Sequence, residues 1–336
     1  MMAIGVTTYG GPEALHEIDV PPERLGATDL RIRVTAAAVS PTDTGVRSGV
    51  RDDKPAAQPP GAVPGMDAAG EVVEVGADVD TGIAVGDRVM AVVVPSGPHG
   101  AYRSDLVVPA RSATRVPAGT SDVEAATLPM NGLTARFALD SLQLQPGQVL
   151  AVTGAAGAFG GYVIQLAKAD GITVVADAAA MDRDLIEGLG ADVVLPRGDG
   201  FIQAVRERYP DGVDALADGA LFNETALAAI KDGGRMATLR GWAGGDQDRV
   251  TVVPVMVAQH ALKWEALDRL REQVEDGVLT LRVADVLPAT QAAEAHRRLE
   301  AGGVRGQLVL TFRREPRSPR AIRRSACLRT ASTART

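Results

Sequence analysis

A short glycine-rich segment is the part of the sequence whose residue types and spacing most clearly suggest chemistry. It reads GAAGAFG at residues 154–160 and lies between an apolar run of strand type and an apolar run of helix type. The spacing Ala155-x-Gly157-x-x-Gly160 matches G-x-G-x-x-G, with alanine replacing the first glycine. Gly157 lets the backbone approach a pyrophosphate, and Gly160 lets the helix pack closely on the strand. Because free N–H groups at the start of a helix attract phosphate, the segment predicts a dinucleotide-binding turn.

The residues after this turn bear on which dinucleotide is preferred. An NAD site places a carboxylate on the ribose 2′-hydroxyl at the end of the second strand, about 20 residues further on. Asp177 lies near that point, but neighbouring residues of a strand face opposite sides of the sheet. If Ala178 holds the position instead, a 2′-phosphate has room, and Arg183 or Arg197 can reach it. Either arginine is equally explained as a solvated charge; we favour NADPH over NADH.

The turn belongs to a regular alternation of strands and helices. Apolar strands are predicted at residues 149–153, 173–176, 193–195, 213–217 and 235–239, and helices between them up to 168 and at 183–189, 201–209 and 223–230. Strict alternation is typical of a parallel sheet with right-handed crossovers. We therefore predict a doubly wound α/β domain whose ligand lies at the carboxyl ends of the strands.

The remaining sequence predicts a second domain. Residues 30–36 and 70–75 alternate in hydropathy or are rich in β-branched side chains, which indicates short strands separated by turns. After an amphipathic helix at 264–275, the sequence ends in a helix and a strand that are too few for a core of their own. The predicted division is a β domain at 1–120, a dinucleotide-binding domain at 121–262, a return segment to the first domain at 263–312 and a basic tail at 313–336.

Composition and charge argue against other classes of protein. The tail holds eight arginines and one glutamate, so the formal net charge of −7 leaves −14 on the rest of the chain. An acidic body argues against nucleic acid as a partner, and we expect the tail to be disordered. No apolar run reaches the roughly 18 to 20 residues of a membrane span, and no secretory leader is recognisable. With a single cysteine, Cys327, we expect a soluble cytoplasmic protein.

Further motifs, together with the turn, resemble those of one superfamily. They are VSPTD at 39–43, GMDAAGEVVEVG at 65–76, GDRV at 86–89, GLTA at 132–135, LGAD at 189–192 and GQLVL at 306–310. In these motifs the chain resembles the medium-chain dehydrogenase/reductase superfamily from Met2 to Phe312, and within it the zinc-independent quinone oxidoreductase-like branch (NADPH:quinone reductases). The resemblance implies a GroES-like β domain, a Rossmann domain and an active site in the cleft between them. It also implies a homodimer formed through an edge strand near residues 250–253.

The chain departs from the zinc-dependent members of that superfamily at the metal ligands. Those relatives carry Cys, His and Cys where this chain has Ser40, Met66 and, near the third position, Met130. A hydroxyl and a thioether in an apolar neighbourhood do not hold zinc, and one cysteine cannot form a four-cysteine structural zinc loop. We therefore expect no bound metal.

The expected lack of a metal bears on the reaction. Hydride addition to a simple ketone gives an alkoxide about as basic as hydroxide, so a Lewis acid or a strong proton donor is needed. Addition to a quinone or an enone gives a delocalised anion whose conjugate acid has a pKa of about 10, by comparison with tyrosine. We predict hydride transfer from NADPH to a quinone or an α,β-unsaturated carbonyl compound. The alternatives are a pathway-specific enone or polyketide reductase and a non-catalytic binding protein that keeps the dinucleotide fold.

The resemblance also assigns residues to the site. Ser40 stands where quinone reductases often have asparagine and Asp43 matches an aspartate of the superfamily, so both are candidate catalytic residues, although Asp43 is also explained as a turn cap. Gly45 replaces a tyrosine proposed to assist the substrate or proton, which leaves the proton donor unidentified. His296, within the last predicted helix, is expected to be half-buried or at the surface. The predicted cofactor contacts are Thr134 beside the nicotinamide, Ala155, Ala156, Gly157, Phe159, Gly160, Ala178, Arg183 and Gly241.

Overall fold

A parallel sheet with helices on both faces forms one half of the molecule in a computed structural model, which describes residues 1–51, 54–55 and 61–312. The predicted basic tail lies outside these residues. The six strands follow the order β12-β11-β10-β13-β14-β15 and all run parallel. Their bounds are β10 (Val149–Thr153), β11 (Thr173–Ala178), β12 (Val193–Pro196), β13 (Val213–Asp218), β14 (Ile230–Thr238) and β15 (Thr251–Pro254). This arrangement is the predicted Rossmann-type domain.

The alternation of side chains along these strands explains why both faces are covered. Leu150 and Val152 of β10 belong to one apolar cluster, whereas Ala151 between them belongs to another on the opposite face. The first face packs against α3 (Pro129–Leu142), α4 (Ala158–Ala169) and α5 (Arg183–Gly188). The second packs against α6 (Phe201–Arg208) and η4 (Asn223–Ala229), which is a 3₁₀ helix where an ordinary helix was expected.

A mostly antiparallel sheet of seven strands forms the other half. The order is β16-β17-β3-β6-β7-β9, with β8 also paired to β3. The strands are β3 (Asp29–Val39), β6 (Asp67–Val75), β7 (Arg88–Val92), β8 (Asp105–Pro109), β9 (Ala113–Arg115), β16 (Val283–Pro288) and β17 (Gln307–Thr311). Two hairpins, β1 (Met2–Gly5) with β2 (His16–Asp19) and β4 (Val50–Arg51) with β5 (Lys54–Pro55), complete the strands. Together with the parallel half, this sheet confirms the predicted fold class.

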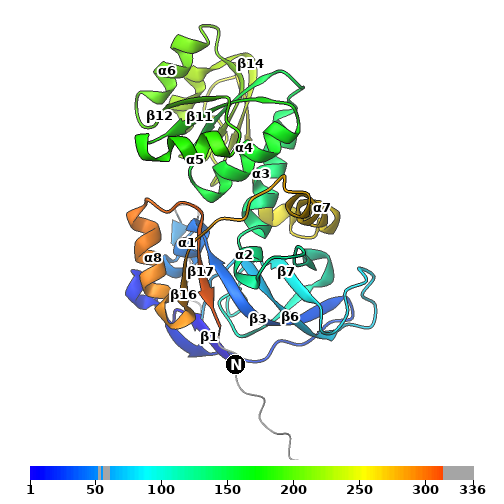
Figure 1. Ribbon diagram of the computed structural model, residues 1–336. Coiled ribbons are helices and arrows are strands. Elements are labelled where there is room, and N and C mark those ends of the chain that lie inside the picture. The colour runs from blue at the N-terminus through cyan, green and yellow to red at the C-terminus, as the bar shows by residue number, and fades with distance from the viewer. Residues whose placement is uncertain (52–53, 56–60, 313–336) are drawn as a thin grey trace, which may run out of the picture.

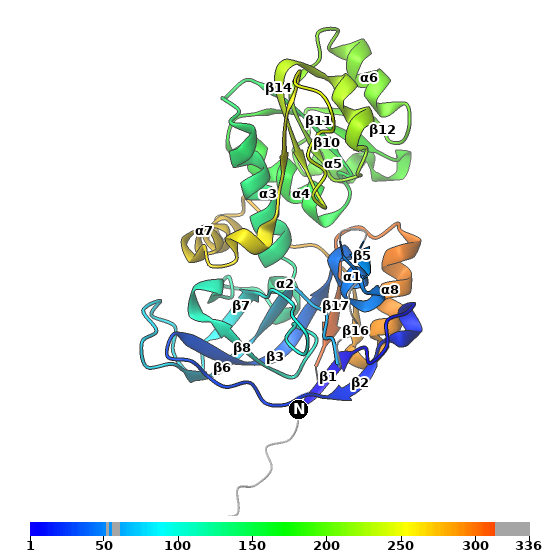
Figure 2. The same ribbon diagram turned by 180° about the vertical axis from the view of Figure 1, so that it is seen from behind.

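The two halves meet at α3. In Figures 1 and 2, which give opposite views, the parallel-sheet half is stacked on the β half, with α3 and α7 (Trp264–Glu275) between them. One apolar cluster runs continuously from Ala36 and Met90 of the β half, through Leu133 of α3, to Val152 of the parallel sheet. Because packed interiors transmit position closely, this shared core fixes how the two halves face each other.

The last 50 described residues return to the β half. β16 runs parallel to β17, and β17 pairs antiparallel with β3, so the end of the described chain is inserted beside its beginning. Along the sequence, β16 and β17 are joined by a segment that contains α8 (Ala292–Ala301). This helix packs against α1 (Pro41–Ser48). Among the described residues, no helix is both long and apolar enough to cross a membrane.

Candidate active site

The glycine-rich turn follows β10 directly and opens α4. Gly154 has a φ of +66°, a left-handed conformation that favours glycine, and it begins the turn. A Cβ on Gly160 would lie 2.5 Å from the carbonyl oxygen of Gly154, so no larger residue fits there. The predicted contacts Ala155 to Gly160 are thereby gathered in one turn at the N-terminus of a 12-residue helix, where free N–H groups can meet phosphate. These features fit a dinucleotide pyrophosphate.

Asp177 is the acidic residue closest to the predicted ribose position, and its carboxylate is hydrogen-bonded to the turn itself. Its carboxylate accepts a hydrogen bond from the N–H of Ala155 at 2.8 Å and another from the backbone of Gly154. Burial raises the pKa of this carboxyl group, although the two backbone donors oppose the rise. The Asp177 carboxylate is therefore used to hold the backbone of the turn. The next residue of the strand is Ala178, which is 6% exposed.

The basic residues near the end of β11 have different surroundings. Arg183 donates to the carbonyl oxygen of Val194 at 3.0 Å and pairs with Glu187 at 3.0 Å, so its guanidinium is engaged on the flank of the sheet. The backbone N–H of Arg197 donates to the carbonyl of Ala178, which places this arginine directly beside the end of the strand. The Arg197 guanidinium forms no hydrogen bond or ion pair within the described ranges. It acts electrostatically to lower the pKa of Asp177.

Gly241 and Trp242 follow β14 at the same edge of the sheet. Gly241 is exposed and has a φ of +82°. The hydroxyl of Thr238 donates to the carbonyl oxygen of Trp242 at 2.6 Å, and the indole packs against the apolar cluster that contains Met236. The contacts of Trp242 are thus those of packing, while Gly241 remains a predicted cofactor contact.

In the β half and at the start of α3, the three positions of the superfamily's zinc ligands carry a poor set of metal donors. Ser40, Met66 and Met130 are all buried. The Ser40 hydroxyl accepts from the side-chain amide of Gln307 at 3.3 Å, and the two methionines belong to the apolar core. Within the part of the chain that the structure describes, no group of three or more His, Cys, Asp or Glu side chains is arranged to hold a metal ion. By its donor chemistry, this set does not fit zinc.

Ser40 and Asp43 form the N-terminal cap of α1. The Asp43 carboxylate accepts from the N–H of Ser40 at 2.8 Å, in a capping box, and from the N–H of Gly65 at 2.9 Å. The phenol of Tyr102 donates to the same carboxylate at 3.1 Å. Because Asp43 is fully buried, its pKa rises to about 6 in spite of these donors. These contacts are those of a cap, and a catalytic role for either residue stays a prediction.

A chain of hydrogen bonds connects Asp43 to the surface. The phenol of Tyr102 also contacts Nε2 of His296 at 3.2 Å, and Nδ1 of His296 lies 3.3 Å from the guanidinium of Arg47. Because arginine only donates, Nδ1 accepts and Nε2 carries the proton. Arg47 pairs in turn with Glu300 at 2.6 Å. His296 is completely buried, which corrects the expectation of a half-buried or surface position, and burial lowers its pKa to about 4.

Asp67 is a functional candidate that sequence reasoning overlooked. One carboxylate oxygen accepts from the N–H of Met130 at 2.6 Å, at the N-terminal turn of α3, and the other has no partner among the described residues. Asp67 is fully buried, and desolvation raises its pKa well above the ordinary value. One turn along α3, the hydroxyl of Thr134 donates to the carbonyl of Met130 at 2.6 Å. The only sequence signal was an aspartate at the start of a strand of small and apolar residues.

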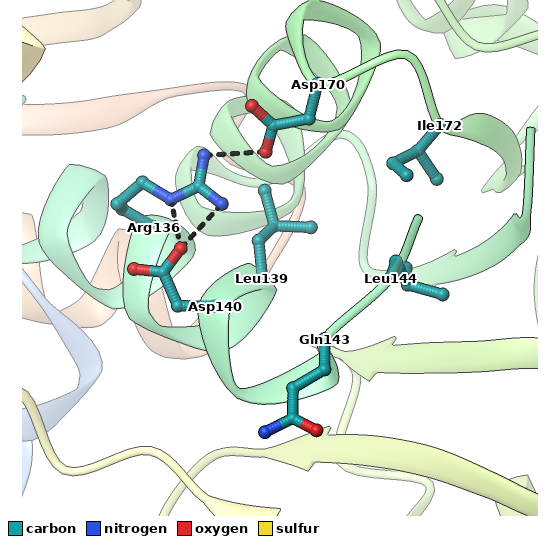
Figure 3. A pocket seen from close by; sticks show the side chains of 7 residues that line it. All are labelled: Arg136, Leu139, Asp140, Gln143, Leu144, Asp170 and Ile172. Atoms are coloured by element: carbon teal, nitrogen blue, oxygen red, sulfur yellow. Dashed lines mark hydrogen bonds and ion pairs between the residues drawn. The ribbon is translucent and has the colours of Figure 1, made fainter. Parts of the chain in front are cut away.

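A surface pocket at the opposite end of α4 is unrelated to this cleft. Figure 3 shows that Arg136 in this pocket faces Asp140 and Asp170, with which it pairs at 2.8 and 2.7 Å. Asp170 is the C-terminal cap of α4, whereas the glycine turn is at the N-terminus of the same helix. The charges of this pocket compensate one another, and we assign no function to it.

The chain matches known proteins over both halves. A family model for the alcohol dehydrogenase GroES-like domain matches residues 26–118, and one for zinc-binding dehydrogenases matches residues 189–310. The chain is 33% identical to the chloroplast envelope quinone oxidoreductase homolog of Arabidopsis thaliana, over 66% of this chain and 70% of that protein. It is 29% identical to the chloroplastic NADPH-dependent alkenal/one oxidoreductase of the same organism, over 92% of this chain and 79% of that protein. A solved structure of mycobacterial Rv1454c complexed with NADPH is 29% identical, with a TM-score of 0.81, and the match covers 93% of this chain and all of that one.

Fold and turn together define a two-domain oxidoreductase of the dinucleotide-binding type. The chain belongs to the medium-chain dehydrogenase/reductase superfamily, in its quinone oxidoreductase-like branch, as the sequence motifs predicted.

Proposed function

We propose that this chain is a zinc-independent, NADPH-dependent oxidoreductase that transfers hydride to a quinone or an α,β-unsaturated carbonyl compound. The observation that carries the proposal is the glycine turn at the start of α4, packed in the same apolar cluster as Met66 and Met130. A reduced nicotinamide held by such a turn supplies the hydride. The relatives named above, a quinone oxidoreductase homolog and an alkenal/one oxidoreductase, support the choice of acceptor.

The polarity of the cleft supports a conjugated acceptor. Met66, Met130 and Phe159 belong to one buried apolar cluster, and apolar surroundings suit a flat conjugated ring better than a small hydrophilic ketone. A delocalised product anion is stabilised by ordinary hydrogen bonds, and the protein then mainly has to orient two reacting groups. The Ser40 hydroxyl, directly after β3, and the Gln307 amide of β17 are among the polar groups of this region.

Three features of the β11 end support NADPH over NADH. Asp177 is engaged by the turn, its neighbour Ala178 carries no carboxylate, and Arg197, whose N–H donates to the Ala178 carbonyl, has a guanidinium without a hydrogen-bond partner in the described ranges. We expect the substitution Ala178→Asp to lower kcat/KM for NADPH by about tenfold, because a carboxylate beside the 2′-phosphate adds like-charge repulsion. The value for NADH is expected to change less. Equal losses with both cofactors would show that Ala178 does not face the 2′ position.

The reaction class is tested by following NADPH and NADH oxidation with protein dialysed against a chelator. The acceptors are 1,4-benzoquinone, 9,10-phenanthrenequinone and a simple enone. We expect turnover that prefers NADPH and survives the chelator. Cofactor binding without reduction of any of the three acceptors would favour a pathway-specific reductase. Loss of turnover on chelation would contradict a zinc-independent reaction.

We also propose a homodimer formed through β15. This strand is the last in the parallel sheet, so one of its edges lacks a neighbour in the chain as described. Two copies related by a two-fold axis can join these edges into one continuous sheet.

A further inference from the structure

The return segment at residues 279–282 runs between the two halves and is anchored to both. The N–H of Thr280 donates to the side-chain carbonyl of Gln165 on α4 at 2.9 Å. The N–H of Gln307 on β17 donates to the backbone carbonyl of Arg282 at 3.0 Å. The backbone of Arg282 is therefore part of the β half at a point where the chain touches the helix that follows the cofactor turn.

The side chain of Arg282 reaches the glycine turn. One guanidinium nitrogen donates to the carbonyl oxygen of Ala156 at 3.0 Å, and another donates to that of Gly157 at 2.6 Å. The guanidinium lies over Gly161, where a Cβ would collide with it. Glycine therefore suits the point at which the arginine crosses α4. Two successive carbonyls of the predicted pyrophosphate turn are thus held by one side chain from the opposite domain.

The electrostatics of this placement are unfavourable unless an anion is bound. Gly157 caps the N-terminus of α4, which carries a partial positive charge that repels a cation. No carboxylate contacts the Arg282 guanidinium among the described residues; both of its hydrogen-bond partners are neutral carbonyls. Burial lowers the pKa of Arg282, as expected for a cation without a counter-ion. A phosphate at the end of the helix would compensate the guanidinium and the helix terminus together.

We infer that Arg282 is a positioning residue for the cofactor's pyrophosphate, acting from the β half through the carbonyls of Ala156 and Gly157. This inference rests on the proposed function, because it takes a dinucleotide as the ligand. Because Arg282 binds the two carbonyls, they point toward its guanidinium. The N–H groups of the first turn of α4 then remain free to bind the phosphates. A bound dinucleotide then also strengthens the link between the halves, since its charge compensates a group that belongs to the other domain.

The test compares two ligands that share the adenosine 2′-phosphate but differ in the pyrophosphate. Dissociation constants for NADPH and for 2′-AMP are measured by titration for the wild type and for Arg282→Gln. A third protein, Arg269→Gln, removes the same charge from an exposed position on α7 and serves as the matched control. Arg282→Lys keeps the charge but cannot bridge two carbonyls.

We expect Arg282→Gln to weaken NADPH binding at least about tenfold while 2′-AMP binding stays within about twofold of the wild type. Arg282→Lys should lie in between, and Arg269→Gln should match the wild type. A merely structural role would weaken both ligands in parallel in Arg282→Gln and Arg282→Lys, and that result would overturn the inference. Unchanged NADPH affinity in Arg282→Gln would overturn the inference but not the proposed function. A wild type that binds neither NADPH nor NADH would overturn both.

Discussion

At the scale of single residues, two buried aspartates differ in how many hydrogen bonds their carboxylates accept. Asp43 accepts three hydrogen bonds, and its pKa of about 6 leaves it ionised at pH 7. Asp67 accepts one, from the N–H of Met130, and its pKa is raised well above the ordinary value. The charge on Asp43 contributes to this rise, after desolvation. The larger number of donors therefore favours the charged form of Asp43 more than that of Asp67.

The raised pKa of Asp67 predicts how it tolerates substitution. Asp67→Asn keeps the oxygen that accepts from Met130 and has nearly the same shape as a protonated carboxyl group, so the free energy of unfolding should change by less than about 1 kcal/mol. Asp67→Ala strands a buried N–H and leaves a void, and should cost about 2 to 3 kcal/mol. Urea unfolding at pH 7 measures both. An asparagine variant as unstable as the alanine variant would contradict the raised pKa of Asp67.

At the scale of elements, the chain of hydrogen bonds from Asp43 to Glu300 joins α1 to α8 through Tyr102. Two of its members, His296 and Asp43, act in opposite directions on stability. His296 has a pKa of about 4 in the folded protein against 6.5 unfolded, so its contribution is present above pH 6.5 and is lost as the pH falls to 4. Asp43 has a pKa of about 6 folded against 3.8 unfolded, so its contribution is present below pH 3.8 and is lost as the pH rises to 6. Each amounts to about 3 kcal/mol.

These opposing contributions predict distinct pH profiles for two variants. Between pH 4.5 and 6, the slope of stability against pH should be more positive in Asp43→Asn than in the wild type, because the falling contribution of Asp43 is removed, and more negative in His296→Gln. The wild type should fall between them. The slope of the free energy of unfolding against pH, from urea titrations at four pH values, is the measurement. Because the slope and not the level is compared, a general loss of stability in either variant does not affect the test, and identical slopes would contradict the assignment.

The sequence was most informative about elements whose determinants are local. Gly154 to Gly160 and the alternation of strands around them fall within short windows, so the turn and the Rossmann-type sheet were predictable from spacing alone. The contacts of His296 and Arg282 were not predictable in this way. His296 meets Arg47 across 249 positions, and Arg282 meets Gly157 across 125, so their partners depend on how the return segment is inserted between the halves. The sequence of an amphipathic helix does not indicate which distant residue its histidine contacts.

At the scale of the whole molecule, the free edge of β15 predicts the effect of two proline substitutions. The N–H of Val255 donates inward to the carbonyl of Thr238 at 2.9 Å, so alternation along the strand turns the N–H of Val253 inward and that of Val252 outward. Val252→Pro removes only an outward donor, which an edge strand tolerates. It should therefore give a folded monomer if β15 joins two copies.

The neighbouring substitution supplies the control. Val253→Pro removes a donor from the pairing with β14, so it should lower the free energy of unfolding by about 3 kcal/mol whatever the state of association. Sedimentation velocity reports the mass in solution, and urea unfolding reports the stability. A Val252→Pro protein that remains a dimer with unchanged stability would show that the copies associate through another surface. A wild-type monomer would exclude the proposed edge-to-edge sheet, and the cofactor cleft would then have to be complete within one chain.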